Sequence, residues 1–362
     1  MPGESPMAAL RRKNGRQDPW PISLWGVGNE NWGCGGNMRP QYYADLFRQF
    51  ASYCRHFTPG KKLYKVACGL NNEWNEILLR NAVKFMDGLS IHYYTVPGIW
   101  TEKGSATDFA AEDWKLTIQK AANIEFFIQQ TAAILDRYDP NKRVGIVMDE
   151  WGTWFDVEPG TNPGFLYQQN TIRDALVAGL TLNIFNNHAD RVQVANIAQT
   201  VNVLQAMVLT DGEKMLLTPT YHVFEMFKAH QGATMLPTTV HCDIYAEERP
   251  TPGASGIAGQ IPPPPLTKTP QISASASRDQ AGKIHLSLCN VHHEQSDEAS
   301  IHFRGITPTN ITARILTGPM HAMNTFDNTE EVKPAPFDEF KLNTPDLTIS
   351  LPPRSVVMLD LH

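Results

Sequence analysis

Long hydrophobic runs and blocks of like charge are both missing from this sequence of 362 residues. No apolar stretch reaches the roughly 18 residues of a membrane-spanning helix. The formal net charge of −6 comes from charges scattered along the chain, which offers no basic surface for nucleic acid or anionic lipid. We therefore expect no membrane and no nucleic-acid partner, and a neutral polymer is the more natural one.

Cysteine pairs at metal-binding or redox spacing are missing too. The five cysteines lie far apart, with no C-x-x-C pair, and reduced core thiols are their simplest interpretation. His292, His293 and Glu294 lack the spacing of a metal site, so a solvated turn is the better interpretation. We expect no metal and no cofactor. The first twenty residues lack the apolar middle of a signal peptide, which favours a cytoplasmic location.

The first two-thirds of the chain alternates short apolar segments with amphipathic ones. This pattern indicates repeated β/α units around a parallel sheet. Five units are visible: strands are expected at 23–30, 63–69, 89–95, 143–151 and 191–199, and helices from Pro40 to Phe57 and at 72–85, 117–138, 170–188 and 218–230.

The pattern changes after about residue 232. Segments such as KIHLSLCNV and LTISLPPRSVVMLDL alternate apolar and polar residues between Gly, Pro, Asn and Asp, which is typical of an antiparallel β-sandwich. We expect an α/β catalytic domain over 1–232 and a jelly-roll-like sandwich over 233–362. The Pro/Gly-rich segment 249–270 is interpreted as an exposed excursion of the second domain.

Two glutamates stand out by position. Glu30 closes the first expected strand and Glu150 closes the fourth. In an α/β barrel the carboxyl ends of all strands open onto one face, so the two side chains could meet in one pocket. Paired carboxylates and nearby aromatic rings suit glycoside hydrolysis. From spacing alone, solvated strand-end charges and core tryptophans are an equally good interpretation.

Longer segments carry a family resemblance. WGVGNENWGCGGNMRPQYYADLFRQFASYCR around Glu30 resembles the acid/base segment of the glycoside hydrolase family 51 α-L-arabinofuranosidases, and MDEWGTW around Glu150 resembles their nucleophile segment. LSIHYYT, NIAQTVNVLQAM and LPPRSVVMLDL are also similar to that family. The resemblance implies a (β/α)8 TIM barrel followed by a sandwich, and it makes the five visible strands numbers four to eight.

The same resemblance implies roles for individual residues. Glu30 would be the general acid/base and Glu150 the nucleophile of a retaining, exo-acting α-L-arabinofuranosidase (EC 3.2.1.55). The implied substrate-binding residues are Asn29 at the sugar hydroxyl, His92 and Tyr94 beside the carboxylates, Trp154 in the pocket wall and Gln205 at the furanose ring. Terminal arabinofuranosyl residues of arabinan, arabinoxylan or arabino-oligosaccharides would be the substrate, and the protein would form a homo-oligomer, commonly a hexamer.

The chain departs from that family at its amino-terminal side. The first three β/α units of the barrel are not present, so strands four to eight alone would leave open edges, which predicts association or poor solubility. Two alternatives stay open. One is a related β-glucanase or xylanase, and the other is an inactive, truncated sugar-binding relic.

Overall fold

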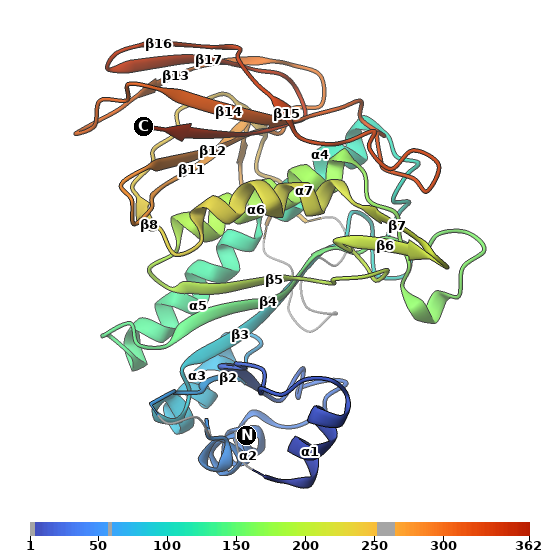
Figure 1. The fold of residues 1–362 in the computed structure, drawn as a ribbon, viewed down its shortest axis with the longest axis vertical. Helices are drawn as coiled ribbons and strands as arrows, with labels where there is room; N and C mark the ends of the chain where they lie inside the picture. Colours follow the sequence, from blue (N-terminus) through green and yellow to red (C-terminus); the bar gives the residue numbers. More distant parts are fainter. Residues whose placement is uncertain (1–3, 57–59, 252–264) are drawn as a thin grey trace. The chain divides into compact units, whose positions relative to one another are not determined.

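The computed structural model describes residues 4–56, 60–251 and 265–362 (Figure 1). They form two compact units. Unit 1 holds residues 1–91 and 129–147, and unit 2 holds residues 92–128 and 148–362. Most of the Pro/Gly-rich excursion expected at 249–270 lies outside the described residues, but its flanks are tied by an antiparallel bridge between Arg249 and Leu266.

The parallel sheet has the strand order β1-β2-β3-β4-β5. Unit 1 contains β1 (Leu24–Val27), β2 (Tyr64–Cys68) and the first residues of β3 (Gly88–Thr95) and β4 (Gly145–Thr153). The pairs β1–β2 and β2–β3 are parallel. Parallel β/α pairing was therefore predicted correctly. That these strands are numbers four to eight of a barrel stays a prediction.

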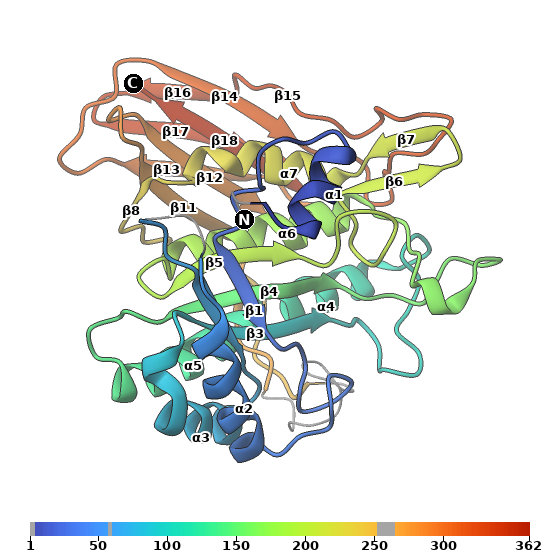
Figure 2. The same cartoon turned by 60° about the horizontal axis from the view of Figure 1, so that its bottom comes forward.

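Helices α1 (Pro6–Lys13), α2 (Pro40–Tyr53) and α3 (Asn72–Ala82), with the short 3-10 helix η1 (Val83–Phe85), also belong to unit 1. Helices α2 and α3 lie side by side (Figure 2). Tyr43 of α2 stacks on Trp74 of α3 with ring centroids 5.6 Å apart. Its hydroxyl donates to the carbonyl of Val27 and accepts from the amide of Cys68, both at 2.7 Å. One side chain thus fixes α2 against the ends of β1 and β2.

Unit 2 continues β3 and β4 and adds β5 (Val192–Ile197), the hairpin β6 (Val208–Asp211) and β7 (Lys214–Leu217), and a 3-10 turn η2 (Pro163–Phe165). Its helices are α4 (Ala111–Ala122), α6 (Ile172–Asn187), α7 (Pro219–Phe227) and the 3-10 turn η3 (Lys228–His230). The single helix expected at 117–138 is wrong in detail. The structure has two helices, α4 and α5 (Ile124–Tyr138), with Asn123 between them.

Helix α6 is buried on every face from Ile172 to Phe185. It lies against strands β11 and β12 of unit 2 (Figure 1), so protein covers its apolar surface. Among the described residues, no helix combines the length and the apolar character that crossing a membrane requires.

The strands after residue 232 form antiparallel sheets, as predicted. The six-stranded sheet has the order β15-β14-β18-β12-β11-β8, and the three-stranded sheet has the order β13-β17-β16; a two-stranded piece pairs β9 with β10. The bounds are β8 Thr234–Leu236, β9 Ile244–Ala246, β10 Thr269–Pro270, β11 Ile272–Arg278, β12 Ile284–Asn290, β13 Asp297–His302, β14 Ile311–Leu316, β15 Ala335–Pro336, β16 Phe340–Asn343, β17 Asp346–Leu351 and β18 Ser355–Leu361. The domain boundary at 232 stays a prediction.

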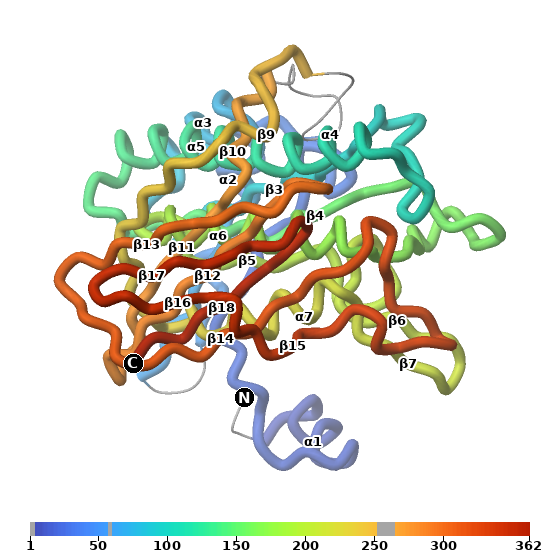
Figure 3. The backbone as a smooth tube through the Cα atoms, turned by 90° about the horizontal axis from the view of Figure 1, so that it is seen from above, coloured from blue at the N-terminus to red at the C-terminus, as the bar shows by residue number. Residues whose placement is uncertain are grey.

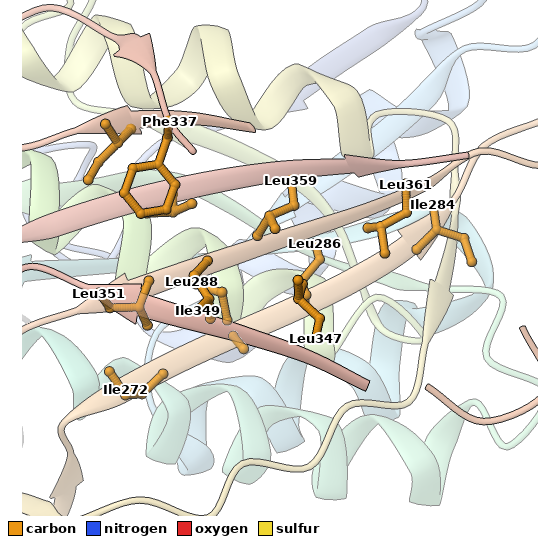
Figure 4. Packing of buried hydrophobic residues seen from close by; sticks show 13 residues of the cluster. Ile272, Ile284, Leu286, Leu288, Phe337, Leu347, Ile349, Leu351, Leu359 and Leu361 are labelled. Carbon is orange, nitrogen blue, oxygen red and sulfur yellow. The ribbon is translucent and has the colours of Figure 1, made fainter. Parts of the chain in front are cut away.

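Figure 3 shows the strands of the two larger sheets from above. These sheets enclose one apolar core, which Figure 4 shows from close by. Leu286 and Leu288 of β12 and Leu347 and Ile349 of β17 point into it. Because side chains alternate along a strand, the opposite face of β12 carries polar residues. There Ser287 donates to Asn183 of α6 at 2.6 Å. The six-stranded sheet is therefore apolar toward its partner sheet and hydrogen-bonded toward α6.

Candidate active site

Glu150 lies near the carboxyl end of β4 and is held by two residues of β3. The hydroxyl of Tyr94 donates a short hydrogen bond to one carboxylate oxygen, and Nδ1 of His92 lies 3.0 Å from the other. His92 and Tyr94 are two residues apart on a strand, so their side chains leave the same face. Both carboxylate oxygens of Glu150 thus have a partner fixed by the sheet.

His92 also contacts the residue before the predicted nucleophile. Its Nε2 lies 3.3 Å from a carboxylate oxygen of Asp149, and the side chain is only 7% exposed. A protonated imidazole donates through both ring nitrogens, so His92 can bridge Asp149 and Glu150. Burial raises the pKa of Glu150. The hydrogen bond and the charge of His92, together with the hydrogen bond from Tyr94, lower it by more, so the pKa lies below its usual value. Glu150 is therefore kept ionised.

Aromatic rings form a wall next to this carboxylate. Trp154 meets Tyr94 edge-on, with ring centroids 4.8 Å apart, and meets Trp100 edge-on at 5.4 Å. The ammonium of Lys103 lies 5.8 Å from the centre of the Trp154 ring. Trp154 remains partly exposed, so it keeps surface on which a sugar can stack.

Gln205 is fully buried and its side-chain amide is used within the protein. Its carbonyl accepts from the backbone amide of Thr153 at 2.8 Å, and its NH2 group donates to the carbonyl of Asp174 and the hydroxyl of Thr220. This network fixes β4 just beyond Glu150. Direct contact of Gln205 with the furanose ring stays a prediction.

A pocket of about 400 Å³ opens beside Glu150 in unit 2. It is lined by Asp149 and Glu150 of β4 and by residues 197–201, which follow β5. From the sequence, Asp149 had no predicted role, and residues 197–201 were noted only within the family-like segment NIAQTVNVLQAM. The acidic doublet Asp149–Glu150 and the NIAQT segment at the end of a strand were the signals for them.

Glu30 lies in unit 1, in a tight turn that follows β1. Its carbonyl accepts from the amides of Gly33 and Gly35 at 2.8 and 3.0 Å, and the thiol of Cys34 donates to its carboxylate at 3.2 Å. Glu30 itself has φ +44°, an uncommon conformation for a residue other than glycine that often marks functional positions. Asn29 is exposed immediately before it.

Two glycines make this turn possible. A Cβ on Gly28, which has φ +106°, would lie 2.1 Å from Oδ1 of Asn31. A Cβ on Gly35 would lie 1.8 Å from the carbonyl oxygen of Asn29. Both distances are far below any contact between such atoms, so larger residues would displace the backbone that carries Asn29 and Glu30.

Several other sequence signals are structural. Trp151 is 1% exposed and packs on Phe185 and Phe224, and Tyr93 donates to the carbonyl of Lys120. These two rings are part of the core, which is the structural interpretation of the aromatic residues.

The turn at His292 is held by its own hydrogen bonds: Nδ1 of His292 accepts from the backbone amides of Glu294 and Gln295. None of the five cysteines, which all lie within the described residues, forms a disulfide; Cys68 and Cys289 are buried and Cys34 is exposed.

Two family models match the chain. The α-L-arabinofuranosidase 1 domain matches residues 1–112, and the α-L-arabinofuranosidase C-terminal domain matches residues 149–355. These ranges contain all seven predicted site residues.

Similar proteins carry the same description. The chain is 44% identical to an intracellular exo-α-L-arabinofuranosidase of Bacteroides ovatus, over 99% of this chain and 68% of that protein. It is 25% identical to a probable α-L-arabinofuranosidase C of Aspergillus niger, over 81% of this chain and 57% of that protein. The structure matches the crystal structure of the GH51 arabinofuranosidase from Xanthomonas axonopodis pv. citri with TM-score 0.90 and 42% identity, over 100% of this chain and 70% of that one.

Proposed function

Because this chain belongs to the glycoside hydrolase family 51 α-L-arabinofuranosidases, we propose that it is a retaining exo-α-L-arabinofuranosidase that removes terminal arabinofuranosyl residues from arabinan, arabinoxylan or arabino-oligosaccharides. The observation that carries this proposal is the setting of Glu150. Its carboxylate is partly buried, held through both oxygens by Tyr94 and His92, and ionised at the edge of a pocket.

In the first step Glu150 attacks the anomeric carbon while Glu30 donates its proton to the leaving oxygen. The bond to the leaving group breaks, and a covalent glycosyl–enzyme forms. Glu30 then removes a proton from water, and the water oxygen displaces Glu150 from the sugar. Tyr94 and His92 orient the Glu150 carboxylate and keep it anionic, because both donate to its charged form. Trp154 offers a ring face to the sugar, and Asn29 donates to a hydroxyl beside the anomeric carbon.

The proposal requires Glu30 and Glu150 to face each other. We propose that β1 to β5 are strands four to eight of a (β/α)8 barrel, in which strand carboxyl ends open onto one face. The parallel pairing of β1, β2 and β3 supports this. The chain spans 68% of the length of the B. ovatus protein and 57% of that of the A. niger protein. A retaining enzyme needs its two carboxyl groups about 5 to 5.5 Å apart.

Hydrolysis of 4-nitrophenyl α-L-arabinofuranoside by the purified chain, beside Glu150→Ala and Glu30→Ala, tests the activity. We expect turnover by the unaltered chain and a loss on the order of 10⁴-fold in kcat for Glu150→Ala. A soluble, folded chain without any turnover would favour the sugar-binding relic. Release of glucose or xylose units from β-glucan or xylan, without release of arabinose, would favour the related glucanase or xylanase.

Azide separates the two glutamates. With Glu150→Ala, azide attacks the substrate directly and gives an arabinosyl azide of inverted configuration. With Glu30→Ala, azide attacks the glycosyl–enzyme and gives the retained configuration. The same configuration from both variants would contradict the assigned roles.

The remaining expectations concern assembly and location. We propose a homo-oligomer, which light scattering of the purified chain measures directly. A cytoplasmic location remains part of the proposal; the B. ovatus relative is named as intracellular. Digestion of arabinan and arabinoxylan, with release of free arabinose as the readout, would rank the two polymers.

A further inference from the structure

The loop of residues 96–110, between β3 and α4, carries one face of the aromatic wall and is held at several points by charged side chains. At its tip Ile99 and Glu102 exchange backbone hydrogen bonds of 3.0 and 3.1 Å, and the amide of Gly98 donates to the carbonyl of Lys103 at 3.1 Å. Trp100 is therefore a central residue of a two-residue hairpin turn. Its ring position depends on how this turn is anchored.

Lys120 anchors the start of the loop. Its ammonium donates to the carbonyls of Val96, Pro97 and Gly98 at 2.8, 2.9 and 3.0 Å, and the residue is 0% exposed. An ammonium has three donors, so three consecutive carbonyls share one buried cation. Burial and the nearby charge of Arg249 lower the pKa of Lys120 to about 8, which leaves it mostly protonated at neutral pH.

Two further charged groups hold the rest of the loop. The carboxylate of Asp156 accepts from the amides of Lys103 and Gly104 at 3.3 and 3.0 Å. The buried guanidinium of Arg173 donates to the carbonyl of Ser105 at 2.9 Å. Because Asp156 and Arg173 fix the far side of the loop, removal of Lys120 would release mainly the segment that leads into Trp100.

We propose that Lys120 is a positioning residue for sugar binding, which holds Trp100 edge-on against Trp154 through the three carbonyls of residues 96–98. A continuous set of contacts supports this: Trp100 touches Trp154, and Trp154 touches Tyr94, whose hydroxyl donates to Glu150. The inference rests on the proposed function, since it assumes that Trp154 stacks on the arabinofuranosyl ring. Lys120 itself contacts no substrate and acts through Trp100.

The first test is a double-mutant cycle of Lys120→Met and Trp100→Ala with 4-nitrophenyl α-L-arabinofuranoside. We expect each single variant to raise KM about 10-fold with kcat within about 3-fold, because ground-state and transition-state binding are weakened alike. The double variant should be no worse than Trp100→Ala alone, because Lys120 then has no ring left to position. The matched control is Lys115→Met on the same helix, whose ammonium lies 5.5 Å from the ring centre of Tyr245; its KM should stay unchanged.

Three results would overturn the inference. The first is an unchanged KM in Trp100→Ala, and the second is a double variant whose increase in KM equals the product of the two single increases. The third is a loss of kcat and of thermal stability in Lys120→Met without a change in KM. If Lys120→Met does not fold, Lys120→Gln retains a donor, and Trp100→Ala alone still decides the first of these results.

A spectroscopic measurement separates this inference from the proposed activity. Edge-on Trp100 and Trp154 should couple in near-ultraviolet circular dichroism, and the coupled signal should be lost in Lys120→Met and in Trp100→Ala but kept in Lys115→Met. This readout needs no turnover. A signal that persists in Lys120→Met contradicts the positioning role, whereas an inactive chain with the expected spectra contradicts only the proposed function.

Discussion

Glu150 accepts hydrogen bonds from the side chains of Tyr94 and His92, whereas the shape of the segment around Glu30 is set mainly by its own backbone. The carbonyl of Glu30 closes the turn by accepting from the amides of Gly33 and Gly35, and its carboxylate accepts from the thiol of Cys34. The nucleophile role proposed for Glu150 requires a carboxylate that stays anionic and aimed, which these donors provide. The acid/base role proposed for Glu30 requires a carboxyl group that gains and loses a proton in each catalytic cycle.

The largest effect should come from removing the donors to Glu150. In His92→Leu combined with Tyr94→Phe, kcat/KM should fall by about 10³-fold, since each hydrogen bond to a charged group contributes about 1.5–3 kcal/mol. Both donors lower the pKa of Glu150, so their loss raises it. The acidic limb of the pH–kcat/KM profile should therefore move to higher pH, as initial rates from pH 3 to 8 would reveal.

The single variants His92→Leu and Tyr94→Phe are the controls for that experiment. Each should show a smaller shift of the same limb in the same direction. A limb that stays in place, or moves to lower pH, would contradict the view that these donors hold Glu150 ionised.

The next effect should come from the backbone turn in unit 1. Gly35→Ala places a methyl group against the carbonyl of Asn29, so the segment must shift. A displacement near 1 Å of a catalytic group lowers kcat by up to about 10²-fold. Gly33→Ala, whose added Cβ would lie at an ordinary contact distance of 3.8 Å from the carbonyl oxygen of Glu30, is the matched control in the same turn. Equal kcat in the two variants would show that the turn does not position Glu30.

Gln205→Leu should change stability more than activity. It leaves the amide of Thr153 and the hydroxyl of Thr220 without their present partner, and such losses cost about 1–3 kcal/mol each in a buried site. Urea unfolding should show the loss, while KM changes by a few-fold at most. An unchanged unfolding midpoint with a raised KM would instead favour the predicted contact of Gln205 with the furanose ring.

The smallest effect is expected at Cys34. Cys34→Ser keeps a donor of similar size next to Glu30 and lies on an exposed part of the turn, so kcat/KM should change by less than about 2-fold. Initial rates with 4-nitrophenyl α-L-arabinofuranoside check this directly. A large loss would mean that the thiol of Cys34 is needed to place the Glu30 carboxylate, as Tyr94 and His92 are for Glu150.

Much of the fold could be predicted because periodicity reports burial directly. The expected strands at 63–69 and 143–151 correspond to β2 and β4, and the alternation after residue 232 predicted strands such as β12 and β17. The break at Asn123 was not predictable in the same way, because apolar periodicity continues from α4 into α5. The hairpin of β6 and β7 could have been predicted, because the Asp211–Gly212 pair is typical of a hairpin turn. The apolar residues around this pair drew attention away from it.

The site shows a similar division. The position of Glu150 near a strand end followed from the strand pattern, whereas the roles of His92 and Tyr94 came from the family resemblance; unit 2 brings these three side chains together. The buried network of Gln205 could not be predicted, because its partners come from positions distant in sequence. Lys120 was also missed: a lysine in an amphipathic helix ordinarily points to solvent, and only the fold reveals that it faces three carbonyls.

The chain crosses from one unit to the other at residues 91–92, 128–129 and 147–148. These crossings lie inside β3, α5 and β4. There is thus no linker at which a protease, or an engineer, could separate the units cleanly. A gene fragment ending at any of these points would cut a strand or helix in mid-course and leave its backbone groups without partners. Chimeras between relatives should therefore exchange whole β/α segments, with junctions placed in loops such as residues 139–144, between α5 and β4.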